Sequence, residues 1–396
     1  MEQPEAEEVT DYRQAQRRLR DHLAAVGALQ DPAWARCHDA VPRHLFIPET
    51  IWTDRGDGYY VPVSRSDDPD LWLDACYSDH FLVTQVDDGA PAGPDGTGDV
   101  LTSSASMPSM VFGMLHHLDV GDGMRVLEVG TATGYNAALL CCRVGDGNVT
   151  TVEIDAGLAA DGLANLAAAG FFPQVITGDG ADGYPGAAPF DRVIATCSVR
   201  DVPYSWVAQT RPGGVIVVPW HTTYAEGGAL ARLTVSPDGT ASGPLVGPAA
   251  FMTLRAQRLA PVDVHRDVHD EDQAEDSATK LSPRVAAFEE DAEFAIGLLV
   301  NARQYIGRSD PASEEFTLWL LDSASGSWAA ADYVPGTDVF EVSQHGPRRL
   351  WDEVEAACRW WDGAGRPALT RFGLTVGADG DQAVWLDSPD HVLRHA

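Results

Sequence analysis

Acidic side chains stand at the ends of successive apolar runs in the middle of the chain. The stretch VLEVGTATGYNAALL carries Glu128 and then passes through small residues into a helical pattern. The next apolar run ends in Glu153, and the one after it is followed by Asp179 in a GDG turn. Parallel strands bring their carboxyl ends to one edge of a sheet, where open α/β sheets bind ligands. The three acids are therefore expected to face a common ligand.

The turn after Glu128 predicts which ligand that is. Its small residues follow the spacing G-x-A-x-G, whereas a dinucleotide fold uses G-x-G-x-x-G to seat a pyrophosphate on a helix N-terminus. Glu153 suits the two ribose hydroxyls, and Asp179 suits an adenine amino group. Such a set describes an adenosine site without a phosphate cradle, as S-adenosylmethionine (AdoMet) requires, with S-adenosylhomocysteine as the product. The turn alone is also compatible with an ordinary tight turn, and the two later acids favour the cofactor site.

The predicted cofactor contacts are Glu128, Gly130, Thr131, Ala132, Gly134, Tyr135, Glu153, Ile154, Asp179 and Gly180.

The elements around this site alternate between strand and helix. Strands are expected at 125–130, 148–155, 173–180, 190–199 and 213–220, and helices at 107–118, 135–144 and 157–170. Alternation of this kind predicts a parallel sheet with helices on both faces. The expected fold class is therefore α/β, a doubly wound, Rossmann-like sheet that binds AdoMet, with an additional α+β C-terminal domain.

The length of 396 residues exceeds one typical core, so more than one domain is expected. Residues 1–100 are predicted to form a helical and substrate-loop region, with an amphipathic helix over 11–30. Residues 101–225 are predicted to form the AdoMet-binding core. Residues 226–396 are predicted to form an α+β C-terminal domain that contains a charged linker over 263–280.

Composition excludes several classes of function. The net charge of −32 argues against binding to nucleic acid or to an anionic membrane surface. The first residues lack a basic and apolar signal sequence, and no apolar run approaches the ~20 residues of a membrane span. The six cysteines contain no CxxC pair, and His116 and His117 are neighbours on a predicted helix that point to different sides. A cytoplasmic protein with free thiols and no metal site is expected.

Several segments together resemble the protein L-isoaspartate O-methyltransferases. RVLEVGTATGYNAALL, VTTVEID, GDGADGYPGAAPFDRVIATCSV and RPGGVIVVPW follow one another as in that family. Upstream, AVPRHLFIPE, YSDHFLVTQ and TSSASMPSM resemble its substrate-side segments, and the match covers roughly residues 35 to 220. The resemblance implies that Ser106 is the active-site serine, with Ser104 close by, and that Glu153 and Asp179 contact ribose and adenine.

The chain also departs from that pattern. Ala132 replaces the middle glycine of the turn, Ser109 stands where repair enzymes often carry histidine, and a stretch rich in Asp, Gly and Pro is inserted at 87–99. The chain continues far beyond residue 220. Extended relatives of this kind resemble methyltransferases that modify ribosomally made peptides in lanthipeptide and graspetide pathways. That resemblance implies a precursor or cyclised peptide as the partner, with the lanthipeptide branch favoured, and it assigns recognition of that peptide to the C-terminal domain, residues 226–396.

The chemistry follows from the acceptor. A carboxylate with a pKa near ~4 is already ionised at neutral pH and needs no base before it attacks a methyl group. The protein must hold that carboxylate in line with the sulfonium, and a hydroxyl such as Ser106 or Ser104 is a suitable donor. The methyl ester would close to a succinimide, which hydrolyses to Asp or isoAsp. A peptide-tailoring Asp methyltransferase, a repair enzyme and a non-catalytic AdoMet-binding partner of a biosynthetic complex remain open from the sequence.

Overall fold

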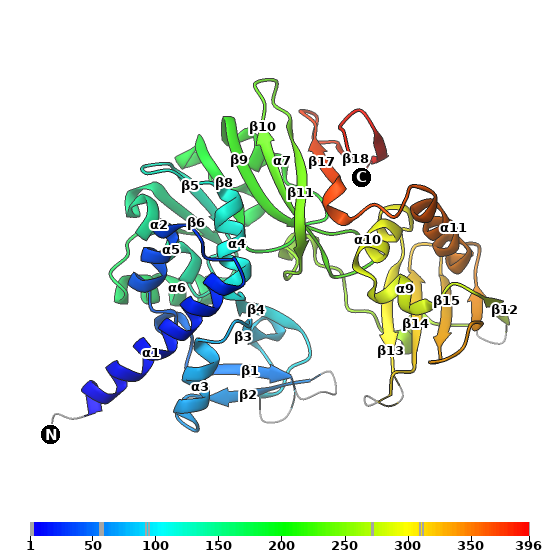
Figure 1. The fold of residues 1–396 in the computed structure, drawn as a ribbon, viewed down its shortest axis with the longest axis horizontal. Helices are drawn as coiled ribbons and strands as arrows, with labels where there is room; N and C mark the ends of the chain where they lie inside the picture. The colour runs from blue at the N-terminus through cyan, green and yellow to red at the C-terminus, as the bar shows by residue number, and fades with distance from the viewer. Residues whose placement is uncertain are drawn as a thin grey trace.

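The computed structural model describes residues 4–54, 59–91, 93, 96–270, 273–308, 310 and 313–395, and the strands of this part form three sheets (Figure 1). The helices are α1 (Pro4–Ala25), α2 (Pro32–Ala40), α3 (Pro69–Cys76), α4 (Pro108–Leu118), α5 (Tyr135–Val144), α6 (Ala156–Ala168), α7 (Tyr204–Ala208), α8 (Val264–Asp267), α9 (Pro283–Phe288), α10 (Glu290–Leu299) and α11 (Leu350–Gly363). No helix within the described residues combines the length and apolar content that crossing a membrane requires.

A ten-stranded sheet in the order β19-β18-β17-β11-β10-β9-β8-β5-β6-β7 forms the centre of the fold. Its strands are β5 (Val126–Val129), β6 (Val149–Glu153), β7 (Gln174–Thr177), β8 (Phe190–Ala195), β9 (Thr210–Trp220), β10 (Gly228–Val235), β11 (Ala241–Ala249), β17 (Phe372–Val376), β18 (Gln382–Leu386) and β19 (Val392–His395). The five neighbouring strands β7, β6, β5, β8 and β9 pair in parallel, as the alternation of strands and helices predicts. Chain order reverses beside β5, because β6 lies on one side of it and β8 on the other, which is where such sheets bind ligands.

Both faces of the parallel strands are covered. Val126 packs into a core with α2, α4 and α5, whereas Leu127 and Val129 face a second core that includes Trp206 of α7 and Phe294 of α10. This burial on two faces explains why the strands read as nearly continuous apolar runs. The predicted doubly wound, Rossmann-like sheet is confirmed.

A small antiparallel sheet leads into the segment that holds Ser104 and Ser106, the two serines predicted to bind the substrate carboxylate (Figure 1). Its order is β2-β1-β3-β4, with β1 (Thr50–Asp54), β2 (Tyr60–Ser64), β3 (Leu82–Val86) and β4 (Leu101–Ala105). Ser104 belongs to β4, and Ser106 follows it directly before α4 begins at Pro108. Proline favours the first turn of a helix, so this short connection is fixed at both ends.

The part of the chain after residue 225 does not form one separate body. β10 and β11 continue the central sheet from β9, and β17 to β19 return to extend it further. The predicted boundary between 225 and 226 therefore cuts through a single sheet. Antiparallel strands added to the edge strand β9 satisfy its backbone groups, which explains why the sheet continues past the parallel core.

The remaining C-terminal strands form a five-stranded antiparallel sheet packed with α9, α10 and α11 (Figure 1). Its order is β12-β16-β15-β14-β13, with β12 (Glu275–Thr279), β13 (Arg303–Gly307), β14 (Phe316–Asp322), β15 (Ser327–Tyr333) and β16 (Phe340–His345). The predicted charged linker over 263–280 thus contains a helical turn, α8, and an edge strand, β12. Exposed acids such as Glu275 and Asp276 are typical of an edge strand, and they conceal its strand character in the sequence.

Candidate active site

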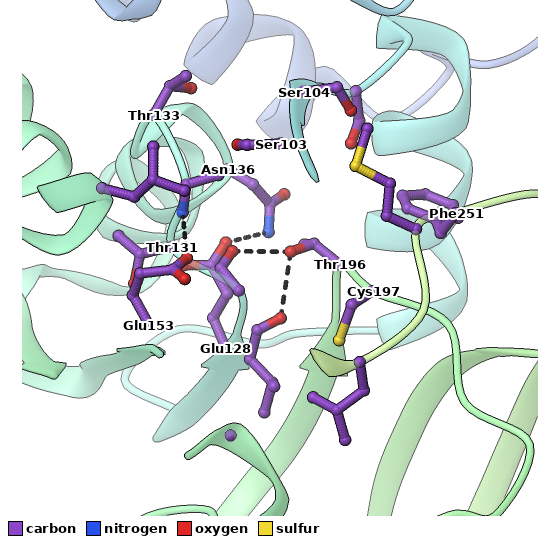
Figure 2. A pocket seen from close by; sticks show the side chains of 18 of the residues that line it. Ser103, Ser104, Glu128, Thr131, Thr133, Asn136, Glu153, Thr196, Cys197 and Phe251 are labelled. Carbon is purple, nitrogen blue, oxygen red and sulfur yellow. Dashed lines mark hydrogen bonds between the residues drawn. The ribbon is translucent and has the colours of Figure 1, made fainter. Parts of the chain in front are cut away.

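One cavity opens at the carboxyl ends of β5, β6 and β8, and segments from distant parts of the chain line it (Figure 2). They include the turn after β5, the end of β6, the serine segment around β4 with the start of α4, the end of β8, and residues 251–258 beyond β11. The lining includes ten of the predicted site residues, namely Ser104, Ser106, Glu128, Gly130, Thr131, Ala132, Tyr135, Glu153, Ile154 and Gly180. Predicted cofactor and acceptor residues are therefore brought to one space, although their roles remain predictions.

Gly134 and Asp179 are the two predicted site residues that do not line the cavity. A Cβ atom on Gly134 would lie 3.0 Å from the Leu166 side chain, so its small size permits the close packing of α6. The Asp179 carboxylate accepts a hydrogen bond of 2.9 Å from the Ala181 backbone N–H and fixes the turn that follows β7. Its neighbour Gly180 does reach the cavity.

The turn after β5 adopts left-handed backbone at alternate positions. The φ angles are 97° at Gly130, 44° at Ala132 and 89° at Gly134. Gly130 is also a close approach, because a Cβ atom there would lie 2.5 Å from the Thr196 hydroxyl oxygen. That hydroxyl donates to the Gly130 carbonyl at 2.7 Å and ties the ends of β5 and β8 together.

Ala132 holds a conformation that suits glycine, so Ala132→Gly should stabilise the protein. A residue with a Cβ atom adopts the left-handed region at a cost of about 1–2 kcal/mol, which glycine avoids. Glycine also increases the conformational entropy of the unfolded chain, and this offsets part of the gain. We expect the free energy of unfolding to rise by up to about 1 kcal/mol in denaturant titrations. The control is Ala164→Gly, the same change at an exposed right-handed position of α6, which should destabilise by about 1 kcal/mol. Equal losses in both variants would contradict the assignment of strain to Ala132.

Glu153 at the end of β6 joins the turn to the start of α6. Its side chain is almost fully buried, and its two oxygens accept from the backbone N–H groups of Ala132 at 2.9 Å and of Asp155 at 3.1 Å. Each carboxylate oxygen has a second lone pair, so the group can also accept from a ligand. This is the arrangement expected of a ribose-binding acid.

Glu128 in the floor of the cavity has an unusual environment. It is fully buried, and Oε1 accepts from the Asn136 amide at 2.8 Å. Among the described residues, Oε2 of Glu128 and Oδ1 of Asn136 have no hydrogen-bond partner. Burial raises the pKa of the Glu128 carboxyl to about 7. Glu128 and Asn136 both line the cavity, and unpaired acceptor oxygens in such residues suit a cationic donor. AdoMet carries an α-ammonium group and a sulfonium, so the residues present fit this cofactor.

AdoMet affinity should therefore depend on pH through Glu128. The raised pKa means that the free protein holds a proton on this carboxyl up to about pH 7, and that proton must leave before the group can accept from an ammonium. We expect the affinity measured by calorimetry to fall about tenfold between about pH 7.5 and about pH 6. Glu128→Gln should bind more weakly and lose the pH dependence. A flat profile in the wild type, or an unchanged slope in the variant, would contradict this role.

Arg43 holds the serine segment in place, a role that the sequence did not predict. This fully buried guanidinium donates to the backbone carbonyls of Ser106 at 3.0 Å and Ala105 at 3.2 Å. It also donates to the carbonyls of Cys76, Ser78 and His80. Arg43 thus ties the acceptor serines to the loop after α3. Only a fold that joins these distant segments reveals that role.

Residues 251–258 form one wall of the cavity. The sequence predicted that these residues belong to the C-terminal domain. Ser198 donates its backbone N–H to the Met252 carbonyl at 2.9 Å and accepts from the Leu254 N–H at 2.8 Å, which fixes the segment beside the end of β8. Figure 2 shows Ser104 and Phe251 on one side of the cavity and the two glutamates on the other. This part of the wall therefore lies on the same side of the cavity as Ser104.

Two arginines of this segment close the rim. Arg255 pairs with Asp155 at 3.3 Å and with Asp88 at 3.1 Å, and Arg258 pairs with Asp88 at 2.8 Å. Asp88 belongs to the inserted stretch at 87–99, of which residues 92, 94 and 95 lie outside the described part. The insertion thus contributes to the site rather than extending away from it.

Comparison with known proteins identifies the family. The family model "Protein-L-isoaspartate(D-aspartate) O-methyltransferase (PCMT)" matches residues 94–258. A protein-L-isoaspartate O-methyltransferase of Methanopyrus kandleri is 33% identical over 258 residues, which are 62% of this chain and 97% of the relative. That of Hyperthermus butylicus is 31% identical over 253 residues, or 61% of this chain and 89% of the relative. Both alignments leave more than a third of the chain without a counterpart.

A solved structure of a protein-L-isoaspartate O-methyltransferase shares the fold, with a TM-score of 0.54 at 19% sequence identity. The superposition covers 94% of this chain and all of the other. The chain therefore belongs to the family of protein-L-isoaspartate O-methyltransferases, enzymes that use AdoMet as the methyl donor.

Proposed function

We propose that this enzyme transfers a methyl group from AdoMet to the carboxylate of an aspartyl or isoaspartyl residue in a peptide or protein. The observation that carries the proposal is the shared cavity. Acceptors suited to a cationic cofactor, Glu128 and Glu153, line the same space as the hydroxyl-bearing residues Ser104 and Ser106. A methyl donor and an anionic acceptor would meet there.

AdoMet supplies a methyl group bonded to a positively charged sulfur. Glu128 and Asn136 would hold its ammonium group, and Glu153 would hold its ribose. The acceptor carboxylate is already ionised at neutral pH, so the protein needs to position it rather than to remove a proton. Ser106, fixed through Arg43, would donate a hydrogen bond to one carboxylate oxygen and leave the other free to attack.

The walls of the cavity favour transfer to the peptide rather than to water. Apolar side chains line part of the cavity, among them Val111, Met114, Ile194 and Phe251. An apolar wall excludes water and strengthens the remaining electrostatic contacts. The methyl ester formed is a better acyl donor than the acid. The next backbone nitrogen of the substrate then attacks the ester carbonyl and releases methanol, and the resulting succinimide hydrolyses to Asp or isoAsp.

Two substrate classes fit this reaction. The first substrate is an isoaspartyl residue in a damaged protein. Relatives that align with about three fifths of the chain, all named for that activity, support it. The second substrate is one particular Asp in a ribosomally made peptide of the lanthipeptide type. The five-stranded sheet and its helices favour it, because contacts remote from the cavity could position one carboxylate of a peptide. The fold likeness to a methyltransferase over 94% of the chain weakens the second argument, because the two-part architecture is not peculiar to this protein.

A head-to-head assay separates the two classes. The full-length enzyme would be given linear isoaspartyl peptides and, in parallel, cyclised Asp-containing peptides encoded beside its gene. Efficient methylation of the linear isoaspartyl peptides supports repair. Methylation confined to a cyclised Asp peptide, followed by loss of methanol in mass spectrometry, supports peptide tailoring. Methylation of neither set would contradict the proposed carboxyl transfer.

A further inference from the structure

Three metal-ligating side chains meet in the C-terminal part, away from the active-site cavity. His269 and Asp270 follow α8, and His345 ends β16, so the three are far apart in the sequence. One ligand atom from each lies within 4.8 Å of the others, and the Asp270 carboxylate is 3.9 Å from Nε2 of His345. The spacing along the chain gave no reason to expect a metal site, because the strand pairing of β16 creates the cluster.

The two histidines are held in place by their surroundings. Nδ1 of His269 lies 3.3 Å from the Asp267 carbonyl, which favours a proton on that nitrogen and a free lone pair on Nε2. The Trp328 indole N–H donates to the His269 carbonyl at 2.8 Å. The Trp328 ring also stacks on the His345 imidazole, with 6.0 Å between the ring centroids. Metal-binding histidines commonly donate their second ring N–H to a carbonyl or carboxylate in this way.

Asp270 places its carboxylate through an unusual backbone conformation. Its φ angle is 53°, in the left-handed region that a residue with a Cβ atom adopts at a cost. Aspartate adopts this region more readily than most residues, and Asp87, Asp88, Asp119 and Asp387 also do so. The φ angle therefore describes how the Asp270 carboxylate is placed 3.9 Å from His345 and does not by itself indicate a ligand.

We propose that His269, Asp270 and His345 bind one divalent transition-metal ion of the Zn²⁺ class. Two imidazoles and a carboxylate are a ligand set that Zn²⁺ accepts, with a fourth position left for water or another ligand. Metal–ligand bonds of about 2 Å place ligand atoms roughly 3.3 Å apart. The cluster must therefore contract, which the exposed side chains of His269 and Asp270 can do by rotation.

The position of the cluster indicates a structural role. None of its residues lines the active-site cavity. The segment before β12 is anchored by a small apolar cluster of Val268, Leu321 and Trp328. A metal ion would join this connecting segment to β16 and so stabilise the five-stranded sheet against local unfolding. Metal binding should therefore raise the thermal midpoint and leave AdoMet affinity unchanged.

The test is calorimetric titration of chelator-treated full-length protein with Zn²⁺. Because the chain carries a net charge of −32, the buffer should contain excess Mg²⁺ to saturate weak acidic sites. We expect one site, with at least tenfold weaker binding in His345→Ala and in the conservative variant His269→Gln. His265→Ala serves as the matched control, since His265 is exposed on α8 and lies outside the cluster. Co²⁺ in place of Zn²⁺ should give a visible absorption band that the two cluster variants lose.

Two results would overturn the proposal. One is the absence of stoichiometric Zn²⁺ binding in the presence of Mg²⁺. The other is unchanged binding in both folded cluster variants, which would place the ion elsewhere in the protein. Circular dichroism of each variant establishes that it is folded. Methyl-transfer activity does not enter this test, so its outcome is independent of the proposed function.

Discussion

Replacing Glu153 by alanine should weaken AdoMet binding at least tenfold. The carboxylate accepts from the backbone N–H groups of Ala132 and Asp155, and it is predicted to accept from the ribose hydroxyls as well. Hydrogen bonds to a charged group contribute roughly 1.5–3 kcal/mol each, so the loss of one corresponds to about a tenfold to hundredfold change in affinity. Calorimetry with the purified variant measures this change directly.

Two further variants separate ribose binding from other effects of Glu153→Ala. Asp161→Ala removes the same charge from an exposed position of α6, and we expect it to bind AdoMet like the wild type. Glu153→Gln keeps one carbonyl oxygen for the Ala132 N–H, so its AdoMet affinity should lie between those of Glu153→Ala and the wild type. Wild-type affinity in a folded Glu153→Ala variant would place the cofactor elsewhere in the protein.

Replacing Ser106 by alanine should reduce methyl transfer by about tenfold to hundredfold, the range for removing one hydrogen bond to a charged acceptor. AdoMet affinity should stay near the wild-type value, because Ser106 is predicted to contact the substrate carboxylate rather than the cofactor. The Arg43 contact is with the Ser106 carbonyl, which the substitution retains. Steady-state kinetics and calorimetry on the same preparation measure both quantities.

Ser109→Ala is the control for this experiment. Ser109 lies on α4 close to Ser106 but does not line the cavity, and the variant should keep full activity. Ser104→Ala tests the second predicted hydroxyl. If Ser106→Ala retains full turnover while Ser104→Ala loses it, the contact to the substrate carboxylate belongs to Ser104 of β4, and the assignment of Ser106 as the active-site serine is wrong.

The cofactor half of the site could be predicted from sequence because it is local. Each strand end and its following turn are read from one short stretch, and parallel strands then bring Glu128, Glu153 and Gly180 to the same edge. Asn136 was missed although it lies close in sequence. Its pairing with Glu128 depends on how α5 packs under the turn, which the apolar pattern of a helix does not specify.

The acceptor half depends on contacts between distant segments. Arg43 reaches the carbonyls around Ser106 only after the small antiparallel sheet has formed, and Arg255 reaches Asp88 across the cavity rim. Nothing in the composition of 251–258 distinguishes it from an ordinary loop. The predicted boundary at 225 divides a single sheet for a related reason, since hairpin-like strands can form a separate sheet or extend an existing one. Pairing of β10 with β9 decides between these.

Transfer of a labelled methyl group from AdoMet to an isoaspartyl peptide tests the central claim most directly. The wild-type enzyme should label the peptide, and mild base should release the label as methanol, because a carboxyl methyl ester is labile where an N-methyl group or an ether is not. Ser106→Ala should give much less label under the same conditions. If the label on peptide substrates is stable to base, or if active-site variants label them as well as the wild type, the enzyme does not methylate a carboxylate at this site.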